Sequence, residues 1–523
     1  MKAWLIAILV TAVLAGEAWA GADLPDAAAA GDAAAVTALL RQKTDVDAAQ
    51  PDGTTALIWA AHRGDEAMVA QLLKAGADAG LANMYGASAM SEAATIGHAG
   101  IIKLLLKAGV DPGAANVEGQ TPLMAVARTG HVDAARVLIE AGADVNAIET
   151  WGGQSALMWA AAQSQADMVA YLVRHGADVN AKGAARIWQR RITAEPRPKD
   201  LNKGGFTALL YAARQGCIDC ARHLVEGGAD LNATDPDRVS PLILALLNFN
   251  FDLAHYLIEA GADVNQWDLY GRTPLYAAID MNTIPIGGRT DIPTEDQRSG
   301  IDIARELLER GANPDIQLKL RPPYRNTAFD RGDNNSLITG ATPLLRAAKA
   351  SDDEAVKLLL AHGAQVDLAN VMGVTPFMSA AGVDQSNNPT RGRFKTDEDA
   401  VETVKILVAA GADIHRHAGV YRDYLEPFTD PLSKFKRTAY DGQTALHGAA
   451  KKGWNRTVAY LVGLGLDLEA RDALGRTPLD LAYGRYEPAF LDAQPAPLPD
   501  TIALLMDLCH KQPTCHLSRE AGL

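Results

Sequence analysis

The feature that most constrains this chain is a five-residue phrase, Gly-Ala-Asp-Val-Asn or close to it, that recurs along the sequence. Its nearly identical copies begin at Gly142, Gly176, Gly228 and Gly261. A second phrase, of the type Gly-x-Thr-Pro-Leu-x-x-Ala-Ala, recurs upstream of such copies and is clearest at 119–127, 271–279 and 442–450. A long-period repeat of this kind predicts stacked units without one closed core, so function is expected on the surface.

The spacing of the second phrase defines the length of the unit. Its Thr or Ser occurs at Thr55, Ser88, Thr121, Ser155, Thr207, Ser240, Thr273, Thr342, Thr375, Thr444 and Thr477, and most neighbours are 33 or 34 residues apart. Three larger gaps equal about one period plus an insertion of 19 to 36 residues. With an N-terminal half-unit at 26–50, we count about twelve units.

The stretch 118–146 shows what each unit is expected to form. Thr121 can cap a first helix, and Pro122 suits its first position. Apolar residues around Leu138 recur at helical spacing in a second helix, which Gly142 ends in a left-handed conformation.

In these positions the chain resembles the ankyrin repeat family, whose unit is a β-turn followed by two antiparallel helices. The resemblance covers about residues 24–512. It implies an all-α repeat solenoid of about twelve stacked ankyrin units with long loop insertions.

Composition and motifs exclude several classes of function. Apolar residues make up 48% and charged residues 21%, which is normal for a globular chain, and the net charge of -14 argues against a general nucleic-acid binder. The sequence has no P-loop, nucleophile elbow, H-E-x-x-H or dinucleotide fingerprint. We therefore expect no enzyme, no cofactor and no metal.

The N-terminus has the features of a secretory signal peptide. Met1 and Lys2 supply positive charge, and the apolar run over 4–14 is too short to span a bilayer. The Ala-Trp-Ala at 18–20 is typical of a cleavage site. We expect cleavage after Ala20 and a periplasmic or secreted protein that does not insert in the membrane; an uncleaved anchor helix is the alternative.

The expected organisation is a signal peptide over 1–20 and a single ankyrin solenoid over 21–523. Insertions are expected at about 183–203, 283–299, 318–339, 386–397 and 418–440. The second and fourth of these fall between the two helices of a unit, and the others extend the connections between units. We expect a monomer.

Four cysteines form two local pairs, Cys217 with Cys220 and Cys509 with Cys515. In an oxidising compartment, each pair is expected to close as a disulfide. The C-x-x-C spacing of the first pair leaves redox chemistry as an alternative, although no βαβ pattern surrounds it. The second pair lies beside two histidines, so metal binding is its alternative.

In ankyrin proteins, partners dock on the concave side formed by the β-turns, or fingers, and the first helices. The resemblance therefore implies partner-binding roles for residues at or beside the fingertips: Tyr85, Trp151, Phe206, Trp267, Tyr270, Met372, Tyr440 and Leu474. A row of large apolar groups on turns has the composition of an interface core. Packing between adjacent fingers is the alternative for each residue.

The insertions add a second candidate surface. Arg186, Arg190 and Arg191 begin a basic segment in an acidic chain. Long loops in a compact fold are usually functional or disordered.

The sequence thus favours an exported, non-catalytic scaffold for an unidentified protein partner. The alternatives are an enzyme or anionic-ligand-binding protein with its site in the basic insertions, and a secreted effector or toxin-neutralising protein.

Overall fold

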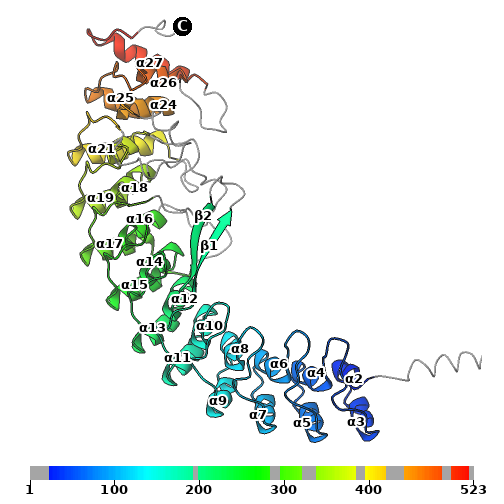
Figure 1. Ribbon diagram of the computed structural model, residues 1–523. Helices are drawn as coiled ribbons and strands as arrows, with labels where there is room; N and C mark the ends of the chain where they lie inside the picture. Colours follow the sequence, from blue (N-terminus) through cyan, green and yellow to red (C-terminus); the bar gives the residue numbers. More distant parts are fainter. Residues whose placement is uncertain are drawn as a thin grey trace, which may run out of the picture. The chain divides into compact units, whose positions relative to one another are not determined.

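A computed structural model describes residues 23–191, 198–282, 295–320, 337, 339–383, 395–419, 441–485 and 496–517 (Figure 1). Over 187–191 and 198–203, the description covers the backbone alone. The chain divides into two compact units, unit 1 (Met1–Pro236) and unit 2 (Asp237–Leu523). The signal peptide lies outside the described residues, and the assignment of 21–523 to a single solenoid stays a prediction.

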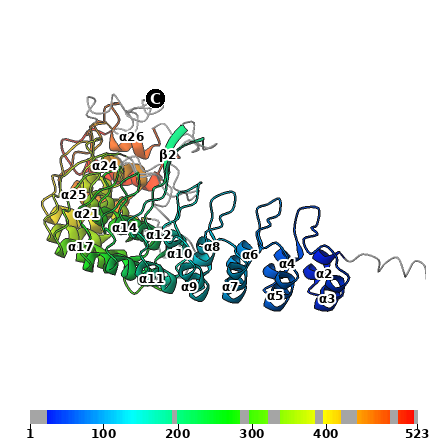
Figure 2. The ribbon, with the colours of Figure 1, turned by 60° about the horizontal axis from the view of Figure 1, so that its bottom comes forward.

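Unit 1 contains six helix pairs in its described part. The first helices are α2 (Leu24–Ala30), α4 (Ala56–His62), α6 (Ala89–Thr95), α8 (Pro122–Thr129), α10 (Ala156–Ala162) and α12 (Ala208–Gln215). The second helices are α3 (Ala33–Arg41), α5 (Glu66–Lys74), α7 (Ala99–Lys107), α9 (Val132–Glu140), α11 (Ala166–Arg174) and α13 (Ile218–Glu226). First helices form one row and second helices another, and the connecting turns project beyond the first row (Figure 2).

Unit 2 likewise contains six helix pairs in its described part. The first helices are α14 (Pro241–Leu247), α16 (Pro274–Asn282), α18 (Pro343–Ala350), α20 (Pro376–Ala380), α24 (Ala445–Lys452) and α26 (Pro478–Ala482). The second helices are α15 (Phe251–Glu259), α17 (Gly300–Glu309), α19 (Asp353–Ala361), α21 (Asp397–Ala409), α25 (Asn455–Gly463) and α27 (Pro499–His510). The predicted all-α repeat fold is confirmed.

The repeated Ser or Thr begins the first helices as expected. Thr121 is representative: its hydroxyl accepts the backbone N–H of Met124 at 3.3 Å. This contact satisfies one of the N–H groups that a helix start leaves without an intrahelical partner. At Thr444 the cap differs, because Nδ1 of His447 contacts both the N–H and the hydroxyl of the threonine, at 3.1 and 2.9 Å.

The Gly-Ala-Asp-Val-Asn phrase links successive repeats through its last residue. The Asn146 side chain accepts the N–H of Asp178 at 2.8 Å and donates to the carbonyl of Gly176 at 3.0 Å. Asn180 makes the same two contacts to Asp230 and Gly228. Gly142 ends its helix with φ of 96°, a conformation that side-chain-bearing residues resist. The phrase therefore recurs because its asparagine joins one repeat to the next.

The core lies between the helix layers and is made mainly of small and aliphatic side chains. In α9, Ala134, Ala135 and Leu138 are fully buried. Because each repeat buries these faces against its neighbours, the stack supplies the core that no single repeat can form. None of the described helices is long and apolar enough to cross a membrane.

The first insertion forms a β-hairpin, which the sequence did not predict. Strand β1 (Ala185–Arg191) pairs antiparallel with β2 (Pro198–Gly204). The segments near 283–299 and 386–397 fall between α16 and α17 and between α20 and α21. Those near 318–339 and 418–440 fall largely outside the described residues.

Candidate functional site

Each finger is organised by a polar side chain at its base. The Asn83 side-chain oxygen accepts the N–H groups of Tyr85 and Ala87 at 3.0 and 2.9 Å. Asn116 makes the equivalent contacts to Glu118 and Gln120, both at 3.0 Å. Because these bonds hold the turn in shape, side chains at the fingertip have defined positions.

Unit 1 carries a row of exposed apolar side chains on three successive fingers, which we name the finger row. Its members and their exposed fractions are Met84 70%, Tyr85 74%, Val117 87%, Ile148 60% and Trp151 69%. The first two of these fingers lie side by side, because a Cβ built on Gly86 would lie 3.9 Å from the side chain of Val117. Adjacent apolar groups that remain this exposed are typical of interaction sites.

The finger that bears Trp151 is one residue longer than its two predecessors, and its base residue is a glutamate. Glu149 is 5% exposed. Its carboxylate accepts the N–H groups of Trp151, Gly152 and Gln154 at 2.6 to 2.9 Å. The longer side chain of glutamate can reach the N–H groups of the longer turn, so the indole of Trp151 is presented by a rigid support.

Trp151 also contacts the β-hairpin. The guanidinium of Arg186, an exposed residue of β1, lies 5.2 Å from the centre of the Trp151 ring. A backbone hydrogen bond also joins this finger to the start of the hairpin: the N–H of Ala184 donates to the carbonyl of Gly152 at 2.7 Å. Two predicted site residues are thus brought together. Arg190 and Arg191 lie in the same strand, and their side chains are outside the description.

The first helices of unit 1 add aromatic groups that the sequence analysis did not select. The Arg128 guanidinium lies 5.6 Å from the Trp159 ring centre. Phe206, a predicted site residue, is half-buried and packs edge to face against Tyr211 with ring centres 5.2 Å apart. Arg214 lies 5.8 Å from the Phe206 ring centre. Unit 1 therefore has further arginine–aromatic pairs at its first helices.

In unit 2, the fingertip residues Trp267 and Tyr270 are less exposed than the finger row. Trp267 is half-buried between two cations, since Arg238 and Lys319 lie 4.0 and 3.2 Å from its ring centre. Tyr270 is half-buried beside Arg272, 5.5 Å from its ring centre. Trp267 thus contacts side chains of neighbouring fingers, and Tyr270 contacts a side chain of its own finger.

Met372 is a correction to the predicted site. Its side chain is buried in a cluster with Val374, Met378, Val383 and Ala418. The burial arises because the chain returns beside this finger after α21, where the N–H of Gly419 donates to the carbonyl of Met372 at 2.9 Å. Leu474 is exposed, as predicted. Tyr440 lies outside the described residues.

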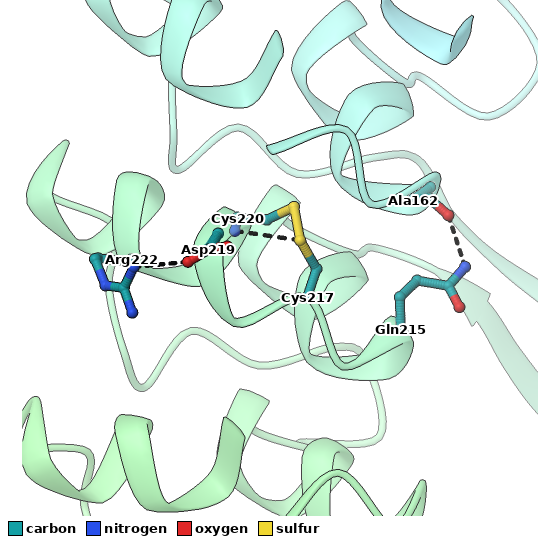
Figure 3. Close-up of a disulfide and its surroundings, with 6 residues drawn as sticks. All are labelled: Ala162, Gln215, Cys217, Asp219, Cys220 and Arg222. Atoms are coloured by element: carbon teal, nitrogen blue, oxygen red, sulfur yellow. Dashed lines mark hydrogen bonds and ion pairs between the residues drawn. A yellow bond between two sulfur atoms is a disulfide. The ribbon is translucent and has the colours of Figure 1, made fainter. Parts of the chain in front are cut away.

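Both cysteine pairs are joined as disulfides, with Cα atoms 5.3 Å apart in each. Cys217 caps the start of α13, and its sulfur accepts the N–H of Cys220 at 3.2 Å (Figure 3). Gln215 beside it donates to the carbonyl of Ala162 in the preceding pair at 2.6 Å. The first disulfide therefore lies at a junction between helix pairs.

Among the described residues, one group of potential metal ligands occurs, and it lies in unit 2. Ligand atoms of His255, Glu259 and Glu306 all lie within 4.8 Å of one another. The group has internal partners, because Nδ1 of His255 donates to Glu306 at 2.8 Å and Arg310 forms an ion pair with Glu259. An ion-pair network accounts for this arrangement.

The geometry defines a helical repeat protein, and comparison with known proteins agrees. The family profile of "Ankyrin repeats (3 copies)" matches residues 24–116, 93–183, 227–318 and 297–418, and that of "Ankyrin repeat" matches 204–236. These ranges span more than half of the chain, which therefore belongs to the ankyrin repeat family. Ankyrin repeats generally mediate protein–protein interaction.

The chain is similar to the putative ankyrin repeat protein YahD of Escherichia coli (strain K12), with 27% identity over 216 residues, 40% of this chain and 83% of that protein. Among solved structures, it is similar to the human ASB11 ankyrin repeat domain, at 23% identity with a TM-score of 0.39. That match covers 46% of this chain and 98% of the domain.

Proposed function

We propose that this protein is an exported, non-catalytic scaffold that binds a protein partner through the finger row and the adjacent β-hairpin of unit 1. The observation that carries the proposal is the finger row itself, in which five large apolar side chains are each at least 60% exposed. Exposed apolar groups of this size cost solubility unless a partner covers them. Aromatic anchors such as Tyr85 and Trp151 are the residue types that dominate binding energy in interfaces.

The rigid fingers support binding of a preformed surface. Consecutive fingers are joined by backbone hydrogen bonds, from Met84 to Asp52 at 2.8 Å and from Thr150 to Glu118 at 3.0 Å. Because these bonds order the fingers before a partner binds, binding should cost the fingers little conformational entropy.

Export is proposed from the N-terminal sequence, whose charged start, short apolar run and Ala-Trp-Ala are those of a cleavable signal peptide. In the bacterium that produces it, the mature protein should begin at Gly21 and be released by osmotic shock. Retention in the cytoplasm with an intact Met1 would show that the export proposal is wrong.

Affinity purification of the tagged protein from the released fraction tests the binding proposal. We expect a stoichiometric protein partner that is lost when Tyr85 and Trp151 are replaced by Ser. A retained small molecule without a protein would instead support an anionic-ligand-binding protein or enzyme, and would contradict the scaffold.

A further inference from the structure

Resting on the proposed function, we propose that the partner segment bound by unit 1 is acidic where it meets Trp151 and Arg186, and apolar where it follows the finger row. The corner formed by these two residues is the point where aromatic and cationic side chains are both exposed. A carboxylate placed there can pair with the guanidinium while apolar carbons beside it contact the indole.

The hairpin concentrates positive charge beside this corner. The sequences of β1 and β2 contain five basic residues and one aspartate, in a chain whose net charge is -14. Their register places Arg186 opposite Lys203 and Arg190 opposite Lys199. This excess of basic residues in an acidic chain favours an acidic ligand.

Among the residues whose side chains are described, no carboxylate forms an ion pair with Arg186 at this corner. Glu149, the acidic residue at the base of the same finger, is buried and directs its oxygens to backbone N–H groups. Among the described residues, no carboxylate forms an ion pair with Arg128 either. Arg128 of α8 is a second exposed cation in unit 1 beside an aromatic ring.

The positive surface is short, which decides the class of ligand. Glu118 is exposed on the finger that precedes the Trp151 finger. Asp52 lies on the finger that precedes the finger row. A duplex nucleic acid or an anionic bilayer would place its charge against these carboxylates as well. A polypeptide can change from acidic to apolar side chains within a few residues, so it fits both parts of the surface.

Selection from a displayed library of random peptides tests this inference without a known partner. The probes are the full-length protein, an Arg186→Glu variant, a Trp151→Ser variant and an Arg222→Glu control. Arg222 lies on the second helix α13, beside Asp219, and its substitution makes the same change of charge away from the fingers.

We expect the selected peptides to be enriched in a block of Asp or Glu followed by aliphatic or aromatic residues. Their binding should weaken about tenfold or more on Arg186→Glu and on Trp151→Ser, and fall with increasing salt, while Arg222→Glu leaves it unchanged. Peptides without acidic enrichment, or binding that Arg186→Glu does not weaken, would overturn the inference.

The proposed function can survive that result. If Trp151→Ser abolishes peptide binding but Arg186→Glu and salt have no effect, the finger row binds polypeptide and only the acidic character is wrong. If neither substitution changes binding, or no peptide is selected, both the inference and the finger-row site are contradicted.

Discussion

Nε2 of His447 donates a hydrogen bond to the backbone carbonyl of Arg476 at 3.0 Å, joining the first helix of one repeat to the finger of the next. Its Nδ1 meanwhile accepts the N–H of Thr444 at 3.1 Å. Only the neutral imidazole can make both contacts, because protonation would convert the acceptor into a donor.

This relationship predicts acid sensitivity. Burial lowers the pKa of His447 from its usual value of about 6.5. The unfolded chain therefore takes up the proton at a higher pH than the folded chain. Stability is full above about pH 6.5 and is lost as the pH falls below that value through the folded-state pKa. Urea unfolding at several pH values should show the loss.

A substitution isolates the contribution of this histidine. His447→Ala should cost about 1 to 3 kcal/mol near neutral pH, because two hydrogen bonds to buried groups are lost, and should flatten the acid dependence. His131→Ala is the control, since His131 is exposed and makes no capping contact. An unchanged acid dependence in His447→Ala would contradict the prediction.

Lys395 carries a second pH-dependent contribution. Its ammonium donates to the carbonyls of Ala380 and Ala348 at 2.7 and 3.2 Å, near the ends of α20 and α18. Burial, assisted by the charge of Lys349, holds the pKa of Lys395 well below its usual value. The unfolded lysine keeps its proton up to about pH 10.4. The wild type should therefore gain stability relative to Lys395→Met as the pH rises toward that value.

Chemical unfolding of both proteins between neutral and alkaline pH measures this gain. Lys405→Met, on the exposed side of α21, supplies a control in which the difference from wild type should change little with pH. Parallel pH profiles for wild type and Lys395→Met would rule out the proposed linkage.

The stacked core predicts the effect of Leu138→Ala. This side chain belongs to α9 and is fully buried, so its truncation should lower the free energy of unfolding by about 2 to 5 kcal/mol. The loss should extend to neighbouring repeats, because each is stabilised mainly by the next. Hydrogen exchange would detect that spread, and exchange confined to α9 would argue against coupled repeats.

The two disulfides predict a mass difference. Because each bond removes two hydrogens, the intact protein should weigh about four hydrogens less than its reduced form. Mass spectrometry after alkylation without reductant checks this. Four alkylated thiols would show that the pairs are not oxidised in the cell.

The sequence predicted the elements that depend on contacts between residues close together in the chain. The caps at Thr121 and its equivalents, and the turn at Gly142, depend on residues a few positions away, so the repeat alone specifies them. The contacts of His447 with Thr444 at the start of α24 are likewise local, since the two residues are three positions apart.

The parts that could not be predicted depend on residues distant in sequence. Met372 is buried because Ala418, 46 residues later, packs beside it. The β1–β2 hairpin requires pairing across an insertion that the repeat does not specify. Met84 and Val117 lie two positions before their finger glycines, Gly86 and Gly119, where the sequence analysis placed no partner-binding residue.

The measurement that tests the finger row most directly is the affinity of the captured partner for a variant with Tyr85, Val117 and Trp151 replaced by Ser. Exposed substitutions change stability by less than about 0.5 kcal/mol each, so helical content and thermal unfolding should stay close to wild type. Loss of interface anchors typically costs about 2 kcal/mol or more, so the affinity should fall at least about thirtyfold. A variant that folds normally and binds its partner with wild-type affinity would contradict the account.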